Sequence, residues 1–230
     1  MQDSTKIHNR GPAMKSLPLP LSRRRTLVLL ASIALVACGR KPIKAHPVPP
    51  GAVVLALGDS LTFGNGAPPE ASYPAELARL TGWEVINAGV PGNTAAQARE
   101  RLPALLETAG AQLLILSIGG NDFLRRLPEA ETRAHIEAIC EATLARGLQV
   151  MLLAVPRPSL TATIGSLTDH PMFAEIAAPR PVVLQRDGWS EVLADSALRS
   201  DAIHANALGY AKQARNVVAT ARAAGMLPSS

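Results

Sequence analysis

The chain has 230 residues, of which 47% are hydrophobic and only 3% aromatic, and its formal net charge is +5. This length accommodates one domain plus a leader, with a core built mainly from Ala, Leu, Val and Ile. Residues 1–37 hold six Lys or Arg and one Asp, which leaves 17 basic and 17 acidic residues beyond position 37. A nucleic-acid-binding protein needs a basic face to neutralise phosphates, so the neutral body excludes that class.

Residues 1–37 are typical of an export leader. Three arginines at 23–25 precede an apolar run of 12 residues at 26–37, which is too short to span a bilayer. The run ends in Leu-Val-Ala-Cys-Gly at 35–39, which resembles the lipobox of bacterial lipoproteins. That resemblance implies lipidation of Cys38, cleavage before it, and a periplasm-facing, membrane-anchored protein of the cell envelope. An ordinary signal peptide and an uncleaved anchor are the alternatives.

The Pro-rich residues 38–52 predict an extended tether between this lipid anchor and a domain over residues 53–227. With Cys38 lipidated, Cys140 is the one cysteine left, so we expect no disulfide. No Cys/His spacing typical of a metal site occurs. Cys140 lies within a helical pattern and is expected to be a buried structural thiol.

From Val53 onward, short apolar runs alternate with longer amphipathic segments. In chain order they predict a strand at 53–57, a helix at 72–80, a strand at 83–86, a helix at 94–109, a strand at 113–118, a helix at 128–146, a strand at 150–155, an irregular segment with five prolines at 156–181, a strand at 182–184 and a closing helix at 205–224. This alternation predicts an α/β fold with helices on both faces of a mainly parallel sheet. Functional sites in such folds lie beyond the carboxyl ends of the strands.

Ser60 follows the first predicted strand in Gly-Asp-Ser-Leu, where a hydroxyl is well placed as an exposed nucleophile. It needs a base, and four histidines lie beyond the leader. His46 falls in the tether, His135 on a polar helix face, and His170 in the irregular segment. His204 follows Asp201 by three residues, a spacing that lets a carboxylate orient an imidazole. The alternative for Asp201 is a helix N-cap.

Acyl transfer also needs donors for the developing oxyanion. Gly92 follows the second strand in Pro-Gly-Asn-Thr, and Asn121 follows the third in Gly-Gly-Asn-Asp. Each segment alone is also compatible with an ordinary turn. Four such segments in order, each at the expected end of a sheet element, favour a catalytic site.

These four segments, together with Arg-Leu-Pro-Ala-Leu-Leu at 101–106, resemble the sequence blocks of the GDSL/SGNH hydrolases over residues 53–220. The resemblance is closest to the periplasmic thioesterase/lysophospholipase and arylesterase group. It implies a three-layer, flavodoxin-like fold with about five parallel strands. It implies Ser60 as nucleophile, His204 as base and Asp201 as its orienter, with an oxyanion hole from the Ser60 and Gly92 N–H groups and the Asn121 side chain. It implies no metal and no cofactor.

The resemblance implies a monomeric esterase for small acyl, aryl or lysophospholipid esters, with acyl thioesters as a further class. Deacetylation of an envelope polysaccharide and a non-catalytic binding module are the alternatives. Phe123 and Leu124, which follow Asn121, predict a modest apolar acyl groove. Residues 156–181 contain none of the four sequence blocks and are candidates for lining the substrate pocket. Ala202 and Ala205 stand where many relatives carry Gly and Pro around the Asp–His pair.

Overall fold

The computed structural model describes residues 45–157 and 167–228. Within these residues, five strands form one sheet in the order β2-β1-β3-β4-β5, and every neighbouring pair is parallel. The strands are β1 (Val53–Gly58), β2 (Glu84–Gly89), β3 (Leu113–Ser117), β4 (Gln149–Leu153) and β5 (Val182–Gln185). This is the flavodoxin-like order of a doubly wound α/β fold, so the predicted fold class is confirmed.

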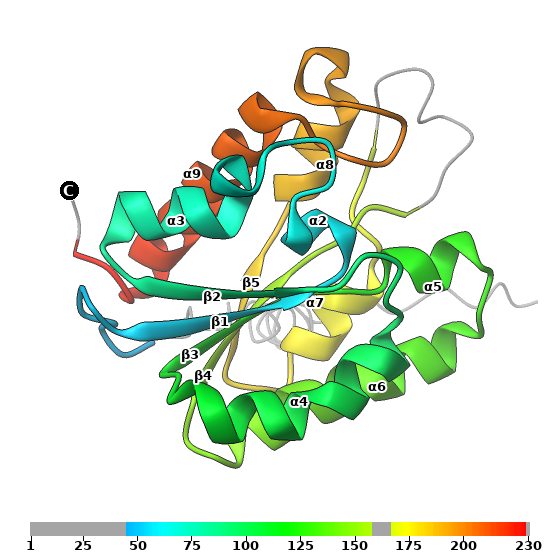
Figure 1. The fold of residues 1–230 in the computed structure, drawn as a ribbon. Helices are drawn as coiled ribbons and strands as arrows, with labels where there is room; N and C mark the ends of the chain where they lie inside the picture. The colour runs from blue at the N-terminus through cyan, green and yellow to red at the C-terminus, as the bar shows by residue number, and fades with distance from the viewer. Residues whose placement is uncertain (1–44, 158–166, 229–230) are drawn as a thin grey trace, which may run out of the picture. The chain divides into compact units, whose positions relative to one another are not determined.

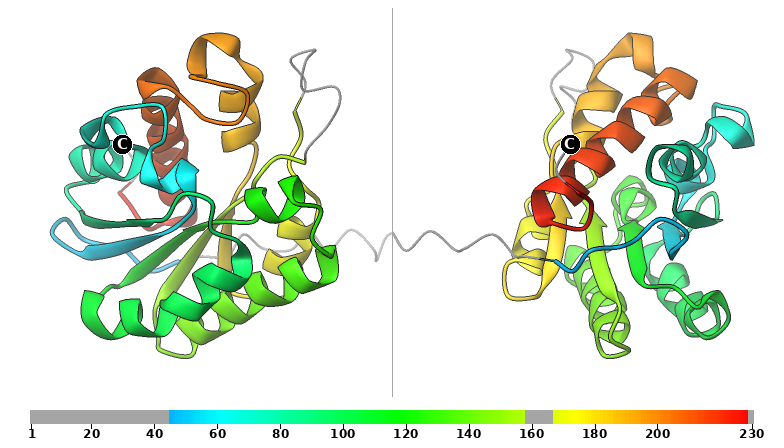
Figure 2. Two further views of the ribbon diagram at one scale, coloured as in Figure 1. Left: turned by 45° about the vertical axis from the view of Figure 1, so that its right-hand side comes forward. Right: turned by 90° about the vertical axis from the view of Figure 1, so that its left-hand side faces the viewer.

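Helices cover both faces of the sheet and complete three layers (Figure 1; Figure 2). One face packs against α3 (Tyr73–Thr81), α8 (Gly188–Ala194) and α9 (Ala207–Ala224). The other packs against α4 (Ala95–Ala109), α6 (Glu129–Leu144) and α7 (Met172–Ala177). The short helices α2 (Ser60–Phe63) and α5 (Gly120–Leu124) follow β1 and β3 directly, with 3₁₀ turns at Pro69–Ala71 and Ser196–Leu198.

Two apolar clusters, one on each face of the sheet, account for the uninterrupted apolar runs of the strands. Val54 points into the cluster shared with α3, α8 and α9, while Leu55 and Leu57 point into the cluster shared with α4, α6 and α7. All five residues of β3 are buried, as expected for a central strand covered on both sides. Cys140 is also fully buried, and burial raises the pKa of its thiol to about 12, so the predicted structural role of this thiol is confirmed.

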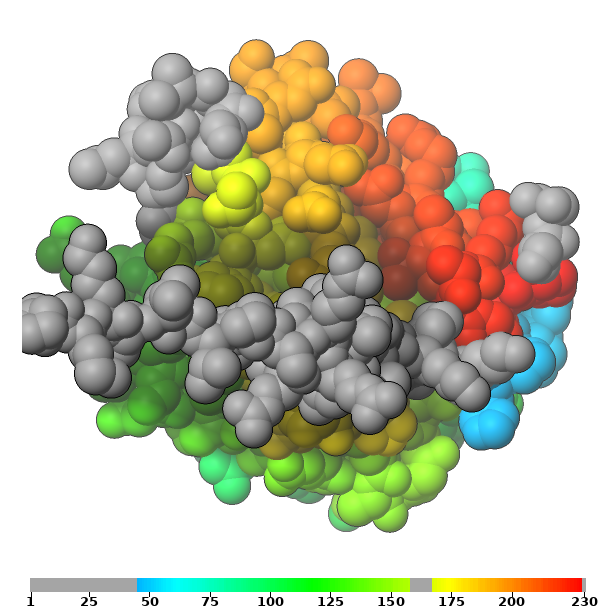
Figure 3. Space-filling model, turned by 180° about the vertical axis from the view of Figure 1, so that it is seen from behind, coloured from blue at the N-terminus to red at the C-terminus, as the bar shows by residue number. Residues whose placement is uncertain are grey.

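The domain begins earlier than the predicted boundary at residue 53, because residues 45–52 pack against it. Val48 is buried, its N–H donates to the Met226 carbonyl at 2.8 Å, and its carbonyl accepts from the Trp83 indole at 3.0 Å. This segment and the end of α9 lie side by side on one face (Figure 3). The Pro-rich composition predicted a tether, but the non-proline residues Ala45 and Val48 donate backbone hydrogen bonds to the Ala224 and Met226 carbonyls. Cys38 and the rest of the leader lie outside the described residues.

Residues 156–181 are not irregular throughout, because α7 occupies part of this range. Pro171 stands at the N-cap of α7, where a missing N–H costs nothing, so the prolines bound this helix instead of excluding it. An antiparallel bridge between Pro156 and Asp169 closes the described ends of the segment. None of the helices in the described part of the chain is long and apolar enough to cross a membrane.

Candidate active site

The predicted site residues lie on four segments: those that follow β1, β2 and β3, and the loop before α9. Ser60 is the first residue of α2, which begins directly after β1. The Asp59 side chain caps the start of this helix, and Gly64, in the left-handed region, ends it. Helix α2 lies directly over β2: a side chain at Gly89 would overlap the backbone of Phe63. A glycine at this position therefore lets the serine-bearing helix sit close to the sheet.

Ser60, His204 and Asp201 form a continuous hydrogen-bonded row. His204 Nε2 lies 3.0 Å from Ser60 Oγ, and His204 Nδ1 lies 2.7 Å from Asp201 Oδ2. The other carboxylate oxygen of Asp201 accepts from the N–H groups of Ile203 and His204, each at 2.8 Å. Burial alone would raise the pKa of Asp201, but these hydrogen bonds hold it below its usual value. Asp201 stays ionised at neutral pH, so Nδ1 carries the ring proton and Nε2 faces the hydroxyl as an acceptor.

Asp201 does not cap the closing helix, because Asn206 does: its side chain accepts from the Gly209 N–H. The same side chain donates to the Ala197 and Arg199 carbonyls, and an antiparallel bridge pairs Arg199 with Ala205. These bonds close residues 199–205 into a tight loop that has Ala202 and Ala205 around the Asp–His pair. The loop therefore presents Asp201 and His204 from a short, well-anchored segment.

The two oxyanion candidates follow β2 and β3, and Asn121 is hydrogen-bonded to Asn93, the residue after Gly92. Asn121, on α5, donates through Nδ2 to the Asn93 carbonyl at 3.1 Å and to Asp59 Oδ2 at 3.3 Å. Gly92 lies in the turn after β2 at φ +80°, and its carbonyl accepts from Arg125 Nη2 at 2.8 Å. Helix α5 and its C-cap residue Arg125 therefore contact both the Gly92 turn and Asp59, the residue before Ser60.

Asp59 is a site residue that the sequence reasoning missed. Its carboxylate is 3% exposed, with Oδ1 accepting from the Leu61 N–H at 3.0 Å and Oδ2 accepting from Asn121. Burial raises the pKa of Asp59 to about 6, against the lowering effect of the Leu61 hydrogen bond and the nearby His204. The sequence shows that Asp59 precedes Ser60, but it does not show in which direction the Asp59 side chain points.

Arg101, which the sequence analysis named only within the segment 101–106 that resembles the family, also supports the site. Its Nε donates to Asn93 Oδ1 at 2.9 Å and its Nη2 donates to the Gly58 carbonyl at 2.8 Å. Asp122, beside Asn121, is buried, and its carboxylate accepts from the Ala95 N–H at 3.0 Å. Burial raises the pKa of Asp122. Two charged side chains thus tie the loops after β1, β2 and β3 to one another.

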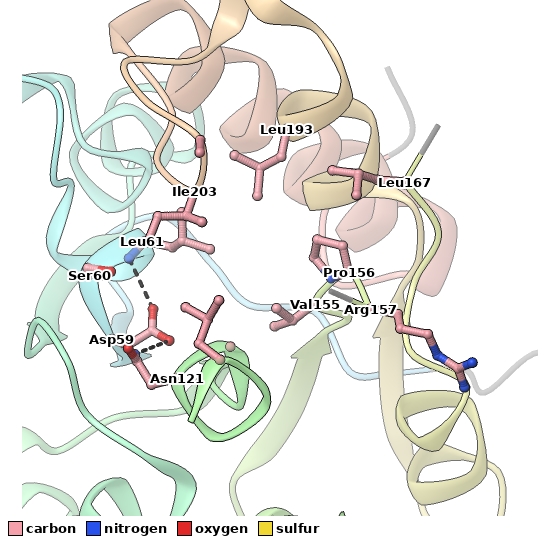
Figure 4. A pocket seen from close by; sticks show the side chains of 13 residues that line it. Asp59, Ser60, Leu61, Asn121, Val155, Pro156, Arg157, Leu167, Leu193 and Ile203 are labelled. Atoms are coloured by element: carbon pink, nitrogen blue, oxygen red, sulfur yellow. Dashed lines mark hydrogen bonds between the residues drawn. The ribbon is translucent and has the colours of Figure 1, made fainter. Parts of the chain in front are cut away.

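A cavity of about 280 Å³ opens beside Ser60. One end is formed by Asp59, Ser60, Leu61, Gly120 and Asn121, and the walls and far end by Leu124, Val155, Pro156, Arg157, Leu167, Leu193, Ala202 and Ile203. Figure 4 shows Ser60 and Asp59 at one end of this space and Arg157 at the other. Leu124 lines the cavity as predicted, whereas Phe123 stacks on the His170 ring at 4.5 Å.

The other histidines do not approach Ser60. His46 exchanges backbone hydrogen bonds with the Gln149 side chain, and His135 Nδ1 lies 3.3 Å from an Arg99 nitrogen on a helix face. His170 is buried, with Nε2 lying 3.6 Å from a Glu129 oxygen. In the part of the chain that the structure describes, no three His, Cys, Asp or Glu side chains gather as metal ligands would.

The sequence matches the model of the GDSL-like Lipase/Acylhydrolase family over residues 56–212. The chain belongs to that family. It is 28% identical over 139 residues to Esterase TesA of Pseudomonas aeruginosa, covering 58% of this chain and 66% of the relative. It is 32% identical over 110 residues to Thioesterase 1/protease 1/lysophospholipase L1 of Escherichia coli K12, covering 46% and 52%. The chain therefore aligns with between about half and just under two thirds of these relatives' length.

The fold agrees with this family membership. The crystal structure of TesA superposes with a TM-score of 0.67 at 23% identity, covering 75% of this chain and 99% of that one. The matched range of the family model contains Ser60, Gly92, Asn121, Asp201 and His204. The five residues are thus all within the segment that defines the family.

The raised pKa of Asp59 predicts how stability changes with pH. The folded protein holds a proton on Asp59 up to about pH 6, and the unfolded chain releases it near 3.8. The folded state therefore binds more protons in this window, so this contribution to stability falls as pH rises through it. Lowering the pH from 7 to 4.5 is expected to raise the free energy of unfolding by roughly 2 kcal/mol more in the wild type than in Asp59→Asn. Urea denaturation at both pH values measures this, and a difference independent of pH would contradict it.

Proposed function

We propose that this protein is a serine-dependent carboxylic ester hydrolase with Ser60 as nucleophile, His204 as base and Asp201 as the orienting carboxylate. The observation that carries this proposal is the row of two hydrogen bonds, 3.0 Å and 2.7 Å, from Ser60 through His204 to Asp201. A hydroxyl becomes an effective nucleophile only beside a base, and that base works best when a third group fixes its tautomer.

In the proposed reaction, His204 Nε2 takes the Ser60 proton while Oγ attacks the ester carbonyl carbon. The charge that develops on the carbonyl oxygen is stabilised by the Ser60 and Gly92 N–H groups and by Asn121 Nδ2. His204 then gives its proton to the leaving alcohol, which leaves an acyl group on Ser60. Water, deprotonated by His204, hydrolyses this acyl-enzyme and regenerates the hydroxyl.

The cavity supports an acyl chain as the group bound beside Ser60. Its walls are mostly aliphatic, and its volume of about 280 Å³ is at the small end of ligand pockets. Small acyl, aryl and lysophospholipid esters, and acyl thioesters, fit this chemistry. A polysaccharide would need hydrogen-bonding partners for its hydroxyls, which Leu124, Val155, Leu193 and Ile203 do not offer, so deacetylation of a glycan is the weaker candidate. A purely binding role would not require an aligned Ser60, His204 and Asp201.

We also propose that the protein works in the cell envelope, anchored by a lipid on Cys38. The support is the sequence alone: three arginines at 23–25, the apolar run at 26–37, and the lipobox-like residues that end at Gly39. One acyl chain gives only weak, reversible membrane binding, so stable anchoring requires the multiple acylation that mature bacterial lipoproteins carry.

Replacing the proposed nucleophile tests the function directly. Ser60→Ala is expected to abolish hydrolysis of p-nitrophenyl acetate and labelling by a fluorophosphonate. Asn121→Ala is expected to lower kcat by about 10²–10³, the usual cost of one oxyanion donor. The control is Ser196→Ala, an exposed serine on a 3₁₀ turn, which should keep both activities. Normal turnover by the Ser60→Ala protein would exclude this mechanism.

Filling the cavity tests its assignment to the acyl chain. Leu193→Trp adds volume to its wall and is expected to lower the ratio of kcat/KM for p-nitrophenyl octanoate to that for acetate about tenfold, since a methylene in a pocket is worth about 1–3 kcal/mol. Leu80→Trp, on α3 and 45% exposed, should leave the ratio unchanged. An unchanged ratio in Leu193→Trp would place the acyl chain elsewhere.

Lipidation is tested by growing cells that express the full chain with an alkyne-tagged fatty acid. The wild type and Cys140→Ala are expected to take up the tag, because Cys140 is buried and is not in the leader. Cys38→Ser is expected to lose it. Equal labelling of the Cys38→Ser protein would contradict the lipoprotein assignment.

A further inference from the structure

The side-chain amide of Asn121 lies between two hydrogen-bond acceptors. Its Nδ2 is 3.1 Å from the Asn93 carbonyl oxygen and 3.3 Å from Asp59 Oδ2. The two ends of a carboxamide have nearly the same shape, so packing alone hardly distinguishes nitrogen from oxygen. Two acceptors do distinguish them, because a flipped amide would place its oxygen against two other oxygens. The surroundings of Asn121 therefore select the orientation of its amide.

One of these acceptors, the Asp59 carboxylate, is an ionisable group buried in the interior. Asp59 is 3% exposed, and its Oδ1 already caps α2 through the Leu61 N–H at 3.0 Å. Serine or asparagine would cap a helix about as well without burying a charge. Ionisation of this carboxyl in the interior costs free energy, as its pKa of about 6 reflects. The cap thus accounts for one oxygen of Asp59, and Asn121 is the hydrogen-bond partner of the other.

We propose that Asp59 is a positioning residue for the reaction: its carboxylate holds the Asn121 amide with Nδ2, not Oδ1, directed at the developing oxyanion. This inference rests on the proposed function of Ser60 and Asn121. The 3.3 Å contact is long for a hydrogen bond to a carboxylate, so it orients the amide while leaving that proton available to the oxyanion. The bond to Asn93 stays in place as the reaction proceeds.

The Asp59 carboxylate is hydrogen-bonded to Asn121 and not to Ser60 or His204. Among the hydrogen bonds of the described residues, those of the Asp59 carboxylate go to Leu61 and Asn121. The orienting carboxylate of His204 is Asp201, which approaches from the opposite side of the ring. The charge of Asp59 also acts on the nearby His204, so only the part of its effect that is lost in an Asn121→Ala background passes through Asn121.

The test variant is Asp59→Asn, which keeps the size and the cap but turns an amide nitrogen toward Asn121. Two NH₂ groups then face each other, and relieving this by flipping Asn121 sets its oxygen against the Asn93 carbonyl. We expect kcat for p-nitrophenyl acetate to fall by about 10–100-fold, up to the limit of one oxyanion donor, with KM changed less than threefold. Asp59→Ser caps α2 but offers no acceptor to Asn121, and it should show the same split if Asp59→Asn folds poorly.

A double-mutant cycle decides whether the effect passes through Asn121. In the Asn121→Ala background no amide remains to be oriented, so Asp59→Asn is expected to lower kcat less than twofold. An equal fall in kcat in both backgrounds, or a change in KM with kcat unaltered, would overturn the proposed role of Asp59. Hydrolysis and Ser60 labelling by the wild type would stand in that case, so this failure differs from failure of the proposed function.

Asp122→Asn is the matched control. Asp122 lies next to Asn121 on α5 and is equally buried, but its carboxylate accepts from the Ala95 N–H and the Thr132 hydroxyl. Its replacement is expected to lower the melting temperature, and its effect on kcat should multiply with that of Asn121→Ala. If Asp122→Asn instead showed the non-additivity expected of Asp59→Asn, a general loosening of α5 would explain both, and the specific role of Asp59 would be wrong.

Discussion

The hydrogen bond between Ser60 and His204 joins residues 144 positions apart, and the rest of the site depends on it. Ser60 is held by the end of β1, and His204 by the loop before α9. A second bond supports the same closure, since the Tyr210 hydroxyl on α9 donates to the Asn65 carbonyl just beyond α2, at 2.6 Å. Behind them the indole of Trp189 packs edge-on to Tyr73 and Tyr210. These aromatic contacts pack α3, α8 and α9 against one another.

Buried charge is concentrated where the loops after β1, β2 and β3 meet. Asp59 and Asp122 are 3% and 2% exposed, and burial raises the pKa of both. Such groups weaken a fold unless each oxygen is hydrogen-bonded, and here they bond to the Leu61 N–H, the Asn121 amide and the Ala95 N–H. Under the proposed function, the stability lost by burying Asp59 is balanced by catalysis, because its carboxylate orients Asn121, the proposed oxyanion donor, before substrate binds.

Periodicity was enough to predict the layers and all five strands, because burial on both faces leaves continuous apolar runs that a sequence displays directly. It missed α2 and α5, which are too short to show a helical period, and it took residues 45–52 for a tether because their contacts are backbone hydrogen bonds with distant segments. Ser60, His204 and Asp201 are joined by hydrogen bonds as expected, and Asn121 lines the same cavity as Ser60. The role of Asp59 could not be read from its neighbours in the chain, since the partner of its second oxygen lies 62 positions away.

The residues that carry the chemistry and those that shape the cavity follow different rules. A proton relay needs fixed atoms at fixed distances, so its residues lie in short motifs at strand ends. The cavity walls at Val155, Pro156, Leu167 and Leu193 need only be apolar and of suitable volume, a requirement that many sequences meet. Relatives at about 30% identity can therefore share the relay and differ in the walls. For this protein, acyl-chain preference has to be argued from the cavity's own side chains and not from the substrates of its relatives.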